Sequence, residues 1–186
     1  MNIKNYFDIF FQALKSISSA QLEQATAILD EAYCYDRTIF VIGNGQSAAT
    51  ASAFALDLTK QTASTLLKRR FRVISLTDNL SAITAWANDV SYEAIFTEQL
   101  KSLFRPDDVL IAVSVSGNSP NVVKACEWVC QQGGQIIGLV GFDGGSIKQL
   151  ADVCIVVNSH DYGHVETAHV ALMHYWVDLF RGRLAQ

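Results

Sequence analysis

Five short runs of apolar residues, each rich in β-branched side chains, are spaced along the chain. They span residues 38–42, 72–76, 108–113, 135–140 and 153–157. The runs lack strict alternation of apolar and polar positions, and segments of helical length separate them. That pattern is typical of parallel strands that are buried on both faces and joined by crossover helices. It predicts a doubly wound, flavodoxin-like α/β fold, with a five-stranded parallel sheet flanked by helices.

Helical patterns precede and follow these runs. Residues 2–35 carry apolar side chains at spacings of three and four, including Phe7, Phe10 and Leu14, which predicts two amphipathic helices. A further helix is expected over 165–184, after a loop at 159–164. The leading helices exceed what the sheet needs for cover, so we interpret them as an N-terminal oligomerisation arm. We expect a dimer or a homotetramer, with the tetramer favoured.

Composition narrows the class of protein. The chain has 186 residues, of which 50% are hydrophobic and 17% charged, as expected of one packed domain. We divide it into N-terminal helices at 1–35 and an α/β core at 36–186. The net charge of -4 would repel a polyanion, which excludes direct nucleic-acid binding from our expectations. The polar N-terminus and the absence of a long apolar run predict a cytoplasmic protein with no signal peptide and no membrane contact.

Two smaller features yield weaker predictions. Basic residues cluster at 68–70 and at 72; we interpret this run as a solvated loop, with a partner-facing patch as the alternative. The cysteines form no C-x-x-C motif, so neither a zinc ribbon nor a disulfide framework is expected. We predict that they are buried small hydrophobic residues. They are Cys34, Cys126, Cys130 and Cys154.

The first candidate site is the segment GNGQSAA at 43–49, which follows the first strand and opens a helix. Glycines permit a sharp turn with backbone N–H groups aimed at an anion, and the helix N-terminus adds a positive dipole end. Ser47 is a candidate cap for that helix. The segment lacks the lysine of a nucleotide P-loop, and Ala48 stands where a dinucleotide fingerprint has its third glycine. Taken alone, the segment is equally compatible with an ordinary tight turn.

The second candidate site is SVSGNSPNV at 114–122, which follows the third strand and opens another helix. It holds Ser114, Ser116 and Ser119. Serine hydroxyls and backbone N–H groups at a helix start can satisfy phosphate oxygens without lysine or arginine. Because ligands of such sheets bind at the carboxyl ends of the strands, the two loops together predict a phosphate site there.

Four motifs occur in order: GNGxSA, AND at 87–89, SxSGNSxNVxKA, and GxxGG at 141–145. In this respect nearly the whole chain resembles the sugar isomerase (SIS) family, and its phosphoheptose isomerase branch in particular. The resemblance implies the SIS fold and a serine loop that holds a sugar phosphate. The substrate-binding residues that it implies are Asn44, Gly45, Ser47, Asn88, Asp89, Ser114, Ser116, Asn118, Ser119 and Glu166.

The resemblance also implies a reaction. Phosphoheptose isomerases convert sedoheptulose 7-phosphate to D-glycero-D-manno-heptose 7-phosphate through an enediol, in lipopolysaccharide or capsule heptose biosynthesis. They use a glutamate and a histidine as acid and base, and the matching residues here are Asp57 and His174. Both side chains titrate, so acid–base chemistry is expected of them.

Three positions depart from the family pattern. Where some members bind zinc, Ala53 replaces a histidine and Glu166 replaces a glutamine, which leaves Asp57, Glu166 and His174 as the ligands of any zinc ion. Gln61 replaces an arginine that meets the substrate.

Non-functional interpretations of three residues stay open. Asp57 can be a surface residue, and Glu166 can be part of a helix cap. For His169, a role as a core or interface histidine is the favoured interpretation.

Two other classes of function remain open. One relative in this family is a non-catalytic tetramer that binds the bacterial replication initiator protein, and its first loop begins GNGTSAA. A sugar-phosphate sensor that binds without turnover is the other alternative. The pairing of Asp57 with His174 favours the enzyme.

Overall fold

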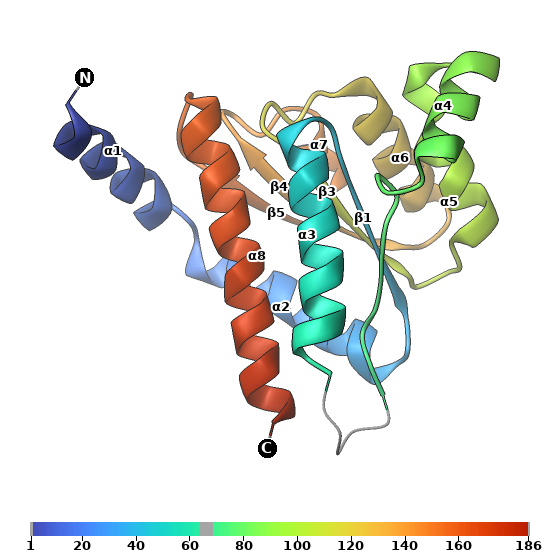
Figure 1. The fold of residues 1–186 in the computed structure, drawn as a ribbon, viewed down its shortest axis with the longest axis horizontal. Helices are drawn as coiled ribbons and strands as arrows, with labels where there is room; N and C mark the ends of the chain where they lie inside the picture. The colour runs from blue at the N-terminus through green and yellow to red at the C-terminus, as the bar shows by residue number, and fades with distance from the viewer. Residues whose placement is uncertain (1, 64–68, 186) are drawn as a thin grey trace.

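The computed structural model describes residues 2–63 and 69–185. At its centre lies a five-stranded, all-parallel sheet in the order β2-β1-β3-β4-β5 (Figure 1). The predicted fold class is confirmed, and each strand boundary lies within one residue of its predicted place. The strands are β1 (Thr38–Gly43), β2 (Arg72–Ser75), β3 (Val109–Ser114), β4 (Gln135–Gly141) and β5 (Val153–Val157).

Helices cover both faces of this sheet, because neighbouring residues of each buried strand point to opposite sides. Alternate strand residues such as Ile39 and Ile111 join one apolar cluster, and their neighbours Phe40 and Leu110 join another. The first cluster is covered by α2 (Ser19–Cys34), α3 (Gln46–Gln61) and α8 (Tyr162–Leu184). The second is covered by α5 (Thr97–Leu103), α6 (Pro120–Gln131) and α7 (Ile147–Leu150). Two further elements, α4 (Leu80–Asp89) and the 3-10 turn η1 (Tyr92–Ala94), lie beyond the carboxyl end of β2.

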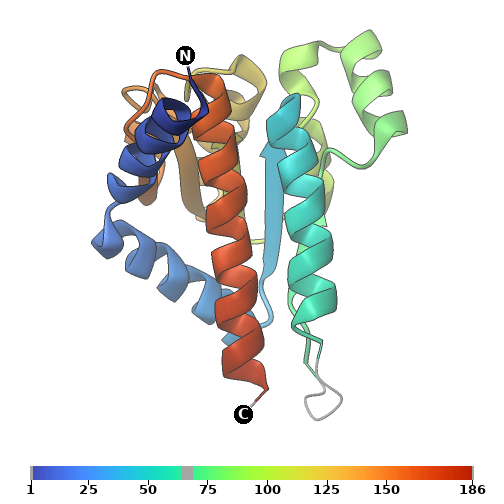
Figure 2. The same cartoon turned by 60° about the vertical axis from the view of Figure 1, so that its left-hand side comes forward.

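The N-terminal segment forms two helices, as expected. The first is α1 (Ile3–Lys15), whose start is capped by the side chain of Asn2, and Ser18 caps α2. Helix α1 reaches away from the sheet and runs beside the start of α8 (Figure 2). Large apolar side chains on α1 are exposed, namely Ile3, Phe7, Ile9 and Phe11. Its role in an oligomer stays a prediction, as does the division at residue 35.

Two helix starts differ from the prediction. Helix α8 begins at Tyr162 instead of after His164, because the side chain of Asp161 accepts a hydrogen bond from the His164 N–H and caps the helix at 3.1 Å. Ser47 does not cap α3. The helix begins at Gln46, the preceding residue is Gly45 with φ of 54°, and no side chain bonds to the first turn.

The cysteine prediction is half wrong: Cys126 and Cys154 are buried, whereas Cys34 and Cys130 are exposed. Burial raises the pKa of Cys126 to about 12 and that of Cys154 to about 11, so both remain thiols at neutral pH.

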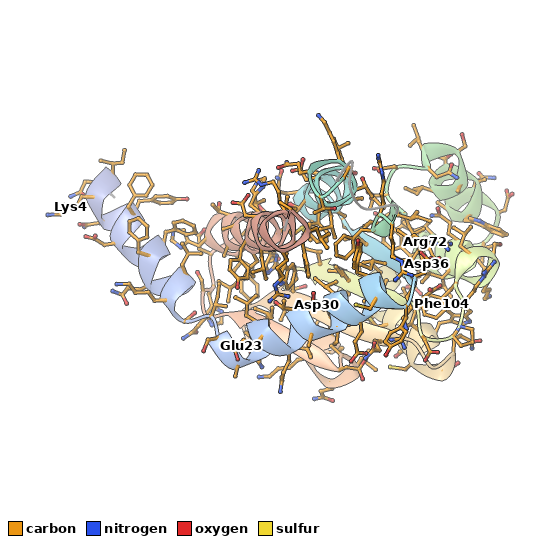
Figure 3. The ribbon with its side chains drawn as sticks, turned by 90° about the horizontal axis from the view of Figure 1, so that it is seen from below. Lys4, Glu23, Asp30, Asp36, Arg72 and Phe104 are labelled. Carbon is orange, nitrogen blue, oxygen red and sulfur yellow. The ribbon has the colours of Figure 1, made fainter. Side chains whose placement is uncertain are left out.

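The basic run lies at the end of α2. Arg69 donates hydrogen bonds to the carbonyls of Tyr33 and Cys34, and Arg72 pairs with Asp36 at 3.3 Å (Figure 3). Cations at a helix C-terminus interact favourably with its dipole. Lys68 lies outside the described residues.

None of the helices in the described part of the chain combines the length and the apolar character that a membrane span requires.

The buried histidine of α8 makes stability depend on pH. His169 is 1% exposed, and burial lowers its pKa from 6.5 to about 4. The unfolded chain therefore takes up the proton first. Stability should be full above pH 6.5 and should fall by about 3 kcal/mol as the pH drops to about 4, where the native imidazole also protonates.

Urea unfolding measured between pH 4 and pH 7.5 checks this expectation. His169→Leu should flatten this part of the pH dependence, and His160→Gln, at an exposed position, should leave it unchanged. Equal slopes in the two variants would contradict the assignment.

Candidate functional site

The predicted loops meet where the sheet changes winding direction. Strands β1 and β3 are neighbours, yet β1 leads to α3 on one face and β3 leads to α6 on the other. The two helices therefore diverge and leave a crevice at the carboxyl ends of the strands, where open α/β sheets bind their ligands.

The crevice holds a pocket of about 410 Å³. Its walls come from the β1–α3 loop, the β3–α6 loop and the first turns of α8. The lining residues are Asn44, Ser47, Val113, Ser114, Val115, Ser116, Ser119, Tyr162 and Glu166. Six of the residues that the resemblance implied for substrate contact are therefore brought together. We call this space the serine pocket.

Hydrogen-bond donors in the serine pocket are neutral. Ser47 lies in the first turn of α3, and the hydroxyls of Ser114 and Ser119 are 3.3 Å apart. Pro120 occupies the first position of α6, where the helix loses no hydrogen bond. Within the described part of the chain, no lysine or arginine lines the pocket, and Glu166 adds a carboxyl group. Hydroxyls, an amide and two helix N-termini are a donor set that suits a phosphate group.

A glycine turn supports the serine loop from beneath. A β-carbon placed on Gly117 would lie 2.0 Å from the carbonyl oxygen of Gly144, so the two backbones touch. The Asn118 side chain joins the same loops: its oxygen accepts bonds from the backbone N–H of Ser146 at 2.9 Å and from the Ser146 hydroxyl at 3.0 Å, and its Nδ2 donates to the Ser116 carbonyl at 3.1 Å. Asn118 thus holds the loop and does not line the serine pocket.

Three other predicted binding residues also lie outside that lining. Gly45 is exposed at the turn before α3. Asn88 and Asp89 are the exposed last residues of α4, and the Asn88 amide donates to Asp89 at 2.7 Å. Contact of these residues with a substrate stays a prediction.

The predicted catalytic pair lines a second hollow, of about 240 Å³, between α3 and α8. Oδ2 of Asp57 lies 3.9 Å from Nδ1 of His174. Gln61 donates from Nε2 to Oδ1 of Asp57 at 2.8 Å, and Arg181 donates to the Gln61 oxygen at 3.4 Å. Asp57 is thereby held from one side and faces the imidazole on the other. We call this space the Asp57–His174 hollow.

The implied zinc site is not assembled. Glu166 lines the serine pocket, whereas Asp57 and His174 line the hollow, and Ala53 offers no ligand. Within residues 2–63 and 69–185, no group of three or more His, Cys, Asp or Glu side chains is placed to hold a metal ion. Within one chain, the residues present do not fit zinc.

Sequence reasoning missed three residues of this region. Tyr162 lines the serine pocket, but it fell within the segment that we expected to be a loop. Asn121 lay inside the recognised motif but received no role, and its side chain is 1% exposed. Tyr92 reaches Asn44 from η1. An asparagine directly after the first proline of a buried helix was the available signal for Asn121.

The model of the SIS domain family matches residues 5–141. A phosphoheptose isomerase of Trichlorobacter lovleyi is 37% identical over 176 residues, covering 91% of this chain and 85% of the relative. That of Helicobacter pylori strain P12 is 38% identical, covering 92% and 89%.

Solved structures agree. The chain superposes on a phosphoheptose isomerase of Neisseria gonorrhoeae with a TM-score of 0.87 at 29% identity, covering 96% of each chain. For that of Francisella tularensis the TM-score is 0.89 at 25% identity, covering 97% of this chain and 96% of the other.

The contact between Gly117 and Gly144 should be needed for anion binding. Gly117→Ala adds a β-carbon against backbone that cannot move away, so we expect inorganic phosphate to bind at least tenfold more weakly, with a lower Tm. Gly133→Ala is the matched control, because Gly133 also has a positive φ but has nothing within 4 Å of the added carbon. Titration calorimetry and thermal unfolding measure both effects. Similar phosphate binding by the two variants would contradict the role of the contact.

Proposed function

This chain belongs to the SIS domain family, and on that basis we propose that it is an enzyme that isomerises sedoheptulose 7-phosphate to D-glycero-D-manno-heptose 7-phosphate. The observation that carries the proposal is the presence of two hollows on the same pair of helices. One has the donors for a phosphate, and the other has an acid–base pair.

The spacing of the two hollows matches a seven-carbon sugar phosphate. From Ser47 to Asp57, α3 rises about 15 Å, and from Glu166 to His174, α8 rises about 12 Å. An open chain advances about 1.2 Å per bond, so eight bonds from C1 of a heptose to its phosphorus span about 10 Å. With a hydrogen bond of about 3 Å at either end, such a substrate reaches from the serine pocket to the Asp57–His174 hollow.

The phosphate end supplies binding energy. Four serine hydroxyls donate hydrogen bonds to the phosphate, namely those of Ser47, Ser114, Ser116 and Ser119. The N-termini of α3 and α6 add backbone N–H groups and their dipoles. Because the phosphate does not react, these contacts fix the register of the sugar chain along α3 and α8. Precise positioning of the reacting carbons then lowers the barrier at the other end.

Proton transfer takes place at the Asp57–His174 hollow. A proton leaves C1 of the ketose while the carbonyl oxygen at C2 gains one, which gives the enediol. Return of a proton to C2 and loss of one from the oxygen at C1 gives the aldose. No oxidant or metal is needed for the balance. Asp57 and His174 face each other across 3.9 Å, and each can hold or release a proton beside these adjacent carbons.

The experiment follows hydrogen exchange and aldose formation from sedoheptulose 7-phosphate in deuterated water. Asp57→Asn and His174→Ala should each lower kcat at least a hundredfold, with KM changed only a few-fold, because they remove proton transfer and leave the serine pocket intact. Asp36→Asn, an exposed carboxylate at the far end of the sheet, is the control. Undiminished turnover in both catalytic variants would overturn the assignment of the pair.

The same assay separates the alternatives. A sensor would bind the sugar phosphate without exchange, and a partner of the replication initiator would show neither exchange nor a loss on Asp57→Asn. Isomerase relatives and the retained acid–base pair support the enzyme over both.

Assembly as a homotetramer through α1 and a cytoplasmic location remain part of the proposal. The exposed apolar side chains of α1 support the first, and the phosphorylated substrate, which the cell keeps in its interior, supports the second.

A further inference from the structure

Two side chains outside the predicted set hold the amide of Asn44 at the serine pocket. Asn44 and Asn121 form a reciprocal pair: Nδ2 of Asn44 donates to Oδ1 of Asn121 at 2.8 Å, and Nδ2 of Asn121 donates to Oδ1 of Asn44 at 2.9 Å. The Tyr92 hydroxyl donates to the same Asn44 oxygen at 3.1 Å. The β1–α3 loop, the start of α6 and η1 are thus joined at one amide group.

This network has one orientation. The backbone N–H of Val122 donates to Oδ1 of Asn121 at 3.0 Å, which fixes which end of that side chain is the oxygen. The Asn121 oxygen then requires the nitrogen of Asn44 opposite it, and the Asn121 nitrogen requires the Asn44 oxygen. A flip of either amide would bring two oxygens or two nitrogens together. Asn121 is 1% exposed, so water cannot compensate for such a mismatch.

Among residues 2–63 and 69–185, the network leaves the side-chain amide of Asn44 with a single free hydrogen-bonding position. A carbonyl oxygen has two lone pairs, and those of Asn44 are taken by Asn121 and Tyr92. Of its two N–H groups, one is given to Asn121. What remains for a ligand is one N–H donor, in a pocket whose other side-chain donors are hydroxyls.

We propose that Asn121 and Tyr92 are positioning residues, which orient Asn44 as a pure hydrogen-bond donor toward the phosphate of the substrate. The inference rests on the proposed function, and it gives that site two residues that touch no substrate. A phosphate dianion accepts and does not donate, so a fixed donor suits it. A freely rotating amide would present its oxygen to the anion for part of the time.

Tyr92→Phe removes one bond and keeps the ring. The Kd for inorganic phosphate and the KM for sedoheptulose 7-phosphate should rise about fivefold, as expected for one lost hydrogen bond, with kcat within twofold. Tyr35→Phe is the matched control, since Tyr35 is an exposed tyrosine at the end of α2, away from the pocket. A purely structural role for Tyr92 would lower Tm without separating KM from kcat.

Asn121→Asp tests orientation, because its effect should depend on pH. The ionised carboxylate faces the Asn44 oxygen with an oxygen of its own, and at pH 8 the Kd for phosphate should exceed the wild-type value at least tenfold. Burial favours the neutral acid, whose O–H can replace the lost N–H donor, so the ratio should approach one as the pH falls toward 5.5. The variant is compared with the wild type at each pH, since inorganic phosphate itself changes protonation state between pH 5.5 and pH 8.

Other charged groups nearby are common to both proteins. They are Glu93 of η1, which pairs with Lys124 of α6, and Glu166 of α8 across the pocket. Because both proteins carry these groups, the ratio of the two Kd values reports the effect of the substitution at position 121.

Relief of the Asn121→Asp defect at low pH, with a raised Kd in Tyr92→Phe, supports the proposal. A ratio that does not change with pH, or a Tyr92→Phe protein that behaves like Tyr35→Phe, overturns it. Phosphate binding without isomerisation by the wild type would contradict the isomerase while leaving this test intact, because the test is read in Kd; failure of the wild type to bind phosphate would overturn both.

Discussion

The whole site depends on the way a parallel sheet must be covered on both faces. Strands β1 and β3 lie side by side, but the chain leaves them toward opposite layers, so the serine pocket opens above their carboxyl ends. Helices α3 and α6 both start there, and each presents unbonded backbone N–H groups. That divergence places the donors that the β1–α3 and β3–α6 loops contribute to the serine pocket. The apolar clusters on the two sides of the sheet make the geometry rigid, since the strands that set the loop positions are almost entirely buried.

The proposed phosphate site has no lysine or arginine in its lining among the residues that the structure describes, so the positions of its loops matter more than they would beside a cation. A lysine is long and can adjust, whereas hydroxyls and backbone N–H groups act only at hydrogen-bond distance and only if they are already in place. Gly117 against Gly144, and Asn118 against Ser146, provide that support on one side. The Asn44–Asn121 pair provides it on the other. These contacts hold neutral hydrogen-bond donors in the positions that a phosphate site without lysine or arginine requires.

Features that depend on local sequence could be predicted, whereas features that depend on contacts between distant residues could not. The five strands followed from β-branched runs without alternation, which are typical of strands covered on both faces. Burial was predicted wrongly for β2, an edge strand whose Arg72 and Ile74 are exposed. The two loops followed from glycine and serine next to those runs. The predictions of Ser47 as a cap and of the start of α8 were wrong. In each case a single residue before the helix decides the start: Gly45 before α3 and Asp161 before α8. The network around Asn44 joins residues far apart in the chain, and no periodicity reports such a contact. The zinc set failed for a related reason: family positions gave Glu166 and His174 as partners, but two turns of helix hold them in different hollows.

The separation of those hollows has an evolutionary consequence. Of the residues that the structure describes, none lines both the serine pocket and the Asp57–His174 hollow, so mutations in one need not disturb the other. Under the proposed function, a lineage can therefore exchange or lose the Asp57–His174 pair and still keep the phosphate site. A scaffold built in this way can acquire new chemistry, or become a receptor, by changing one end of two helices.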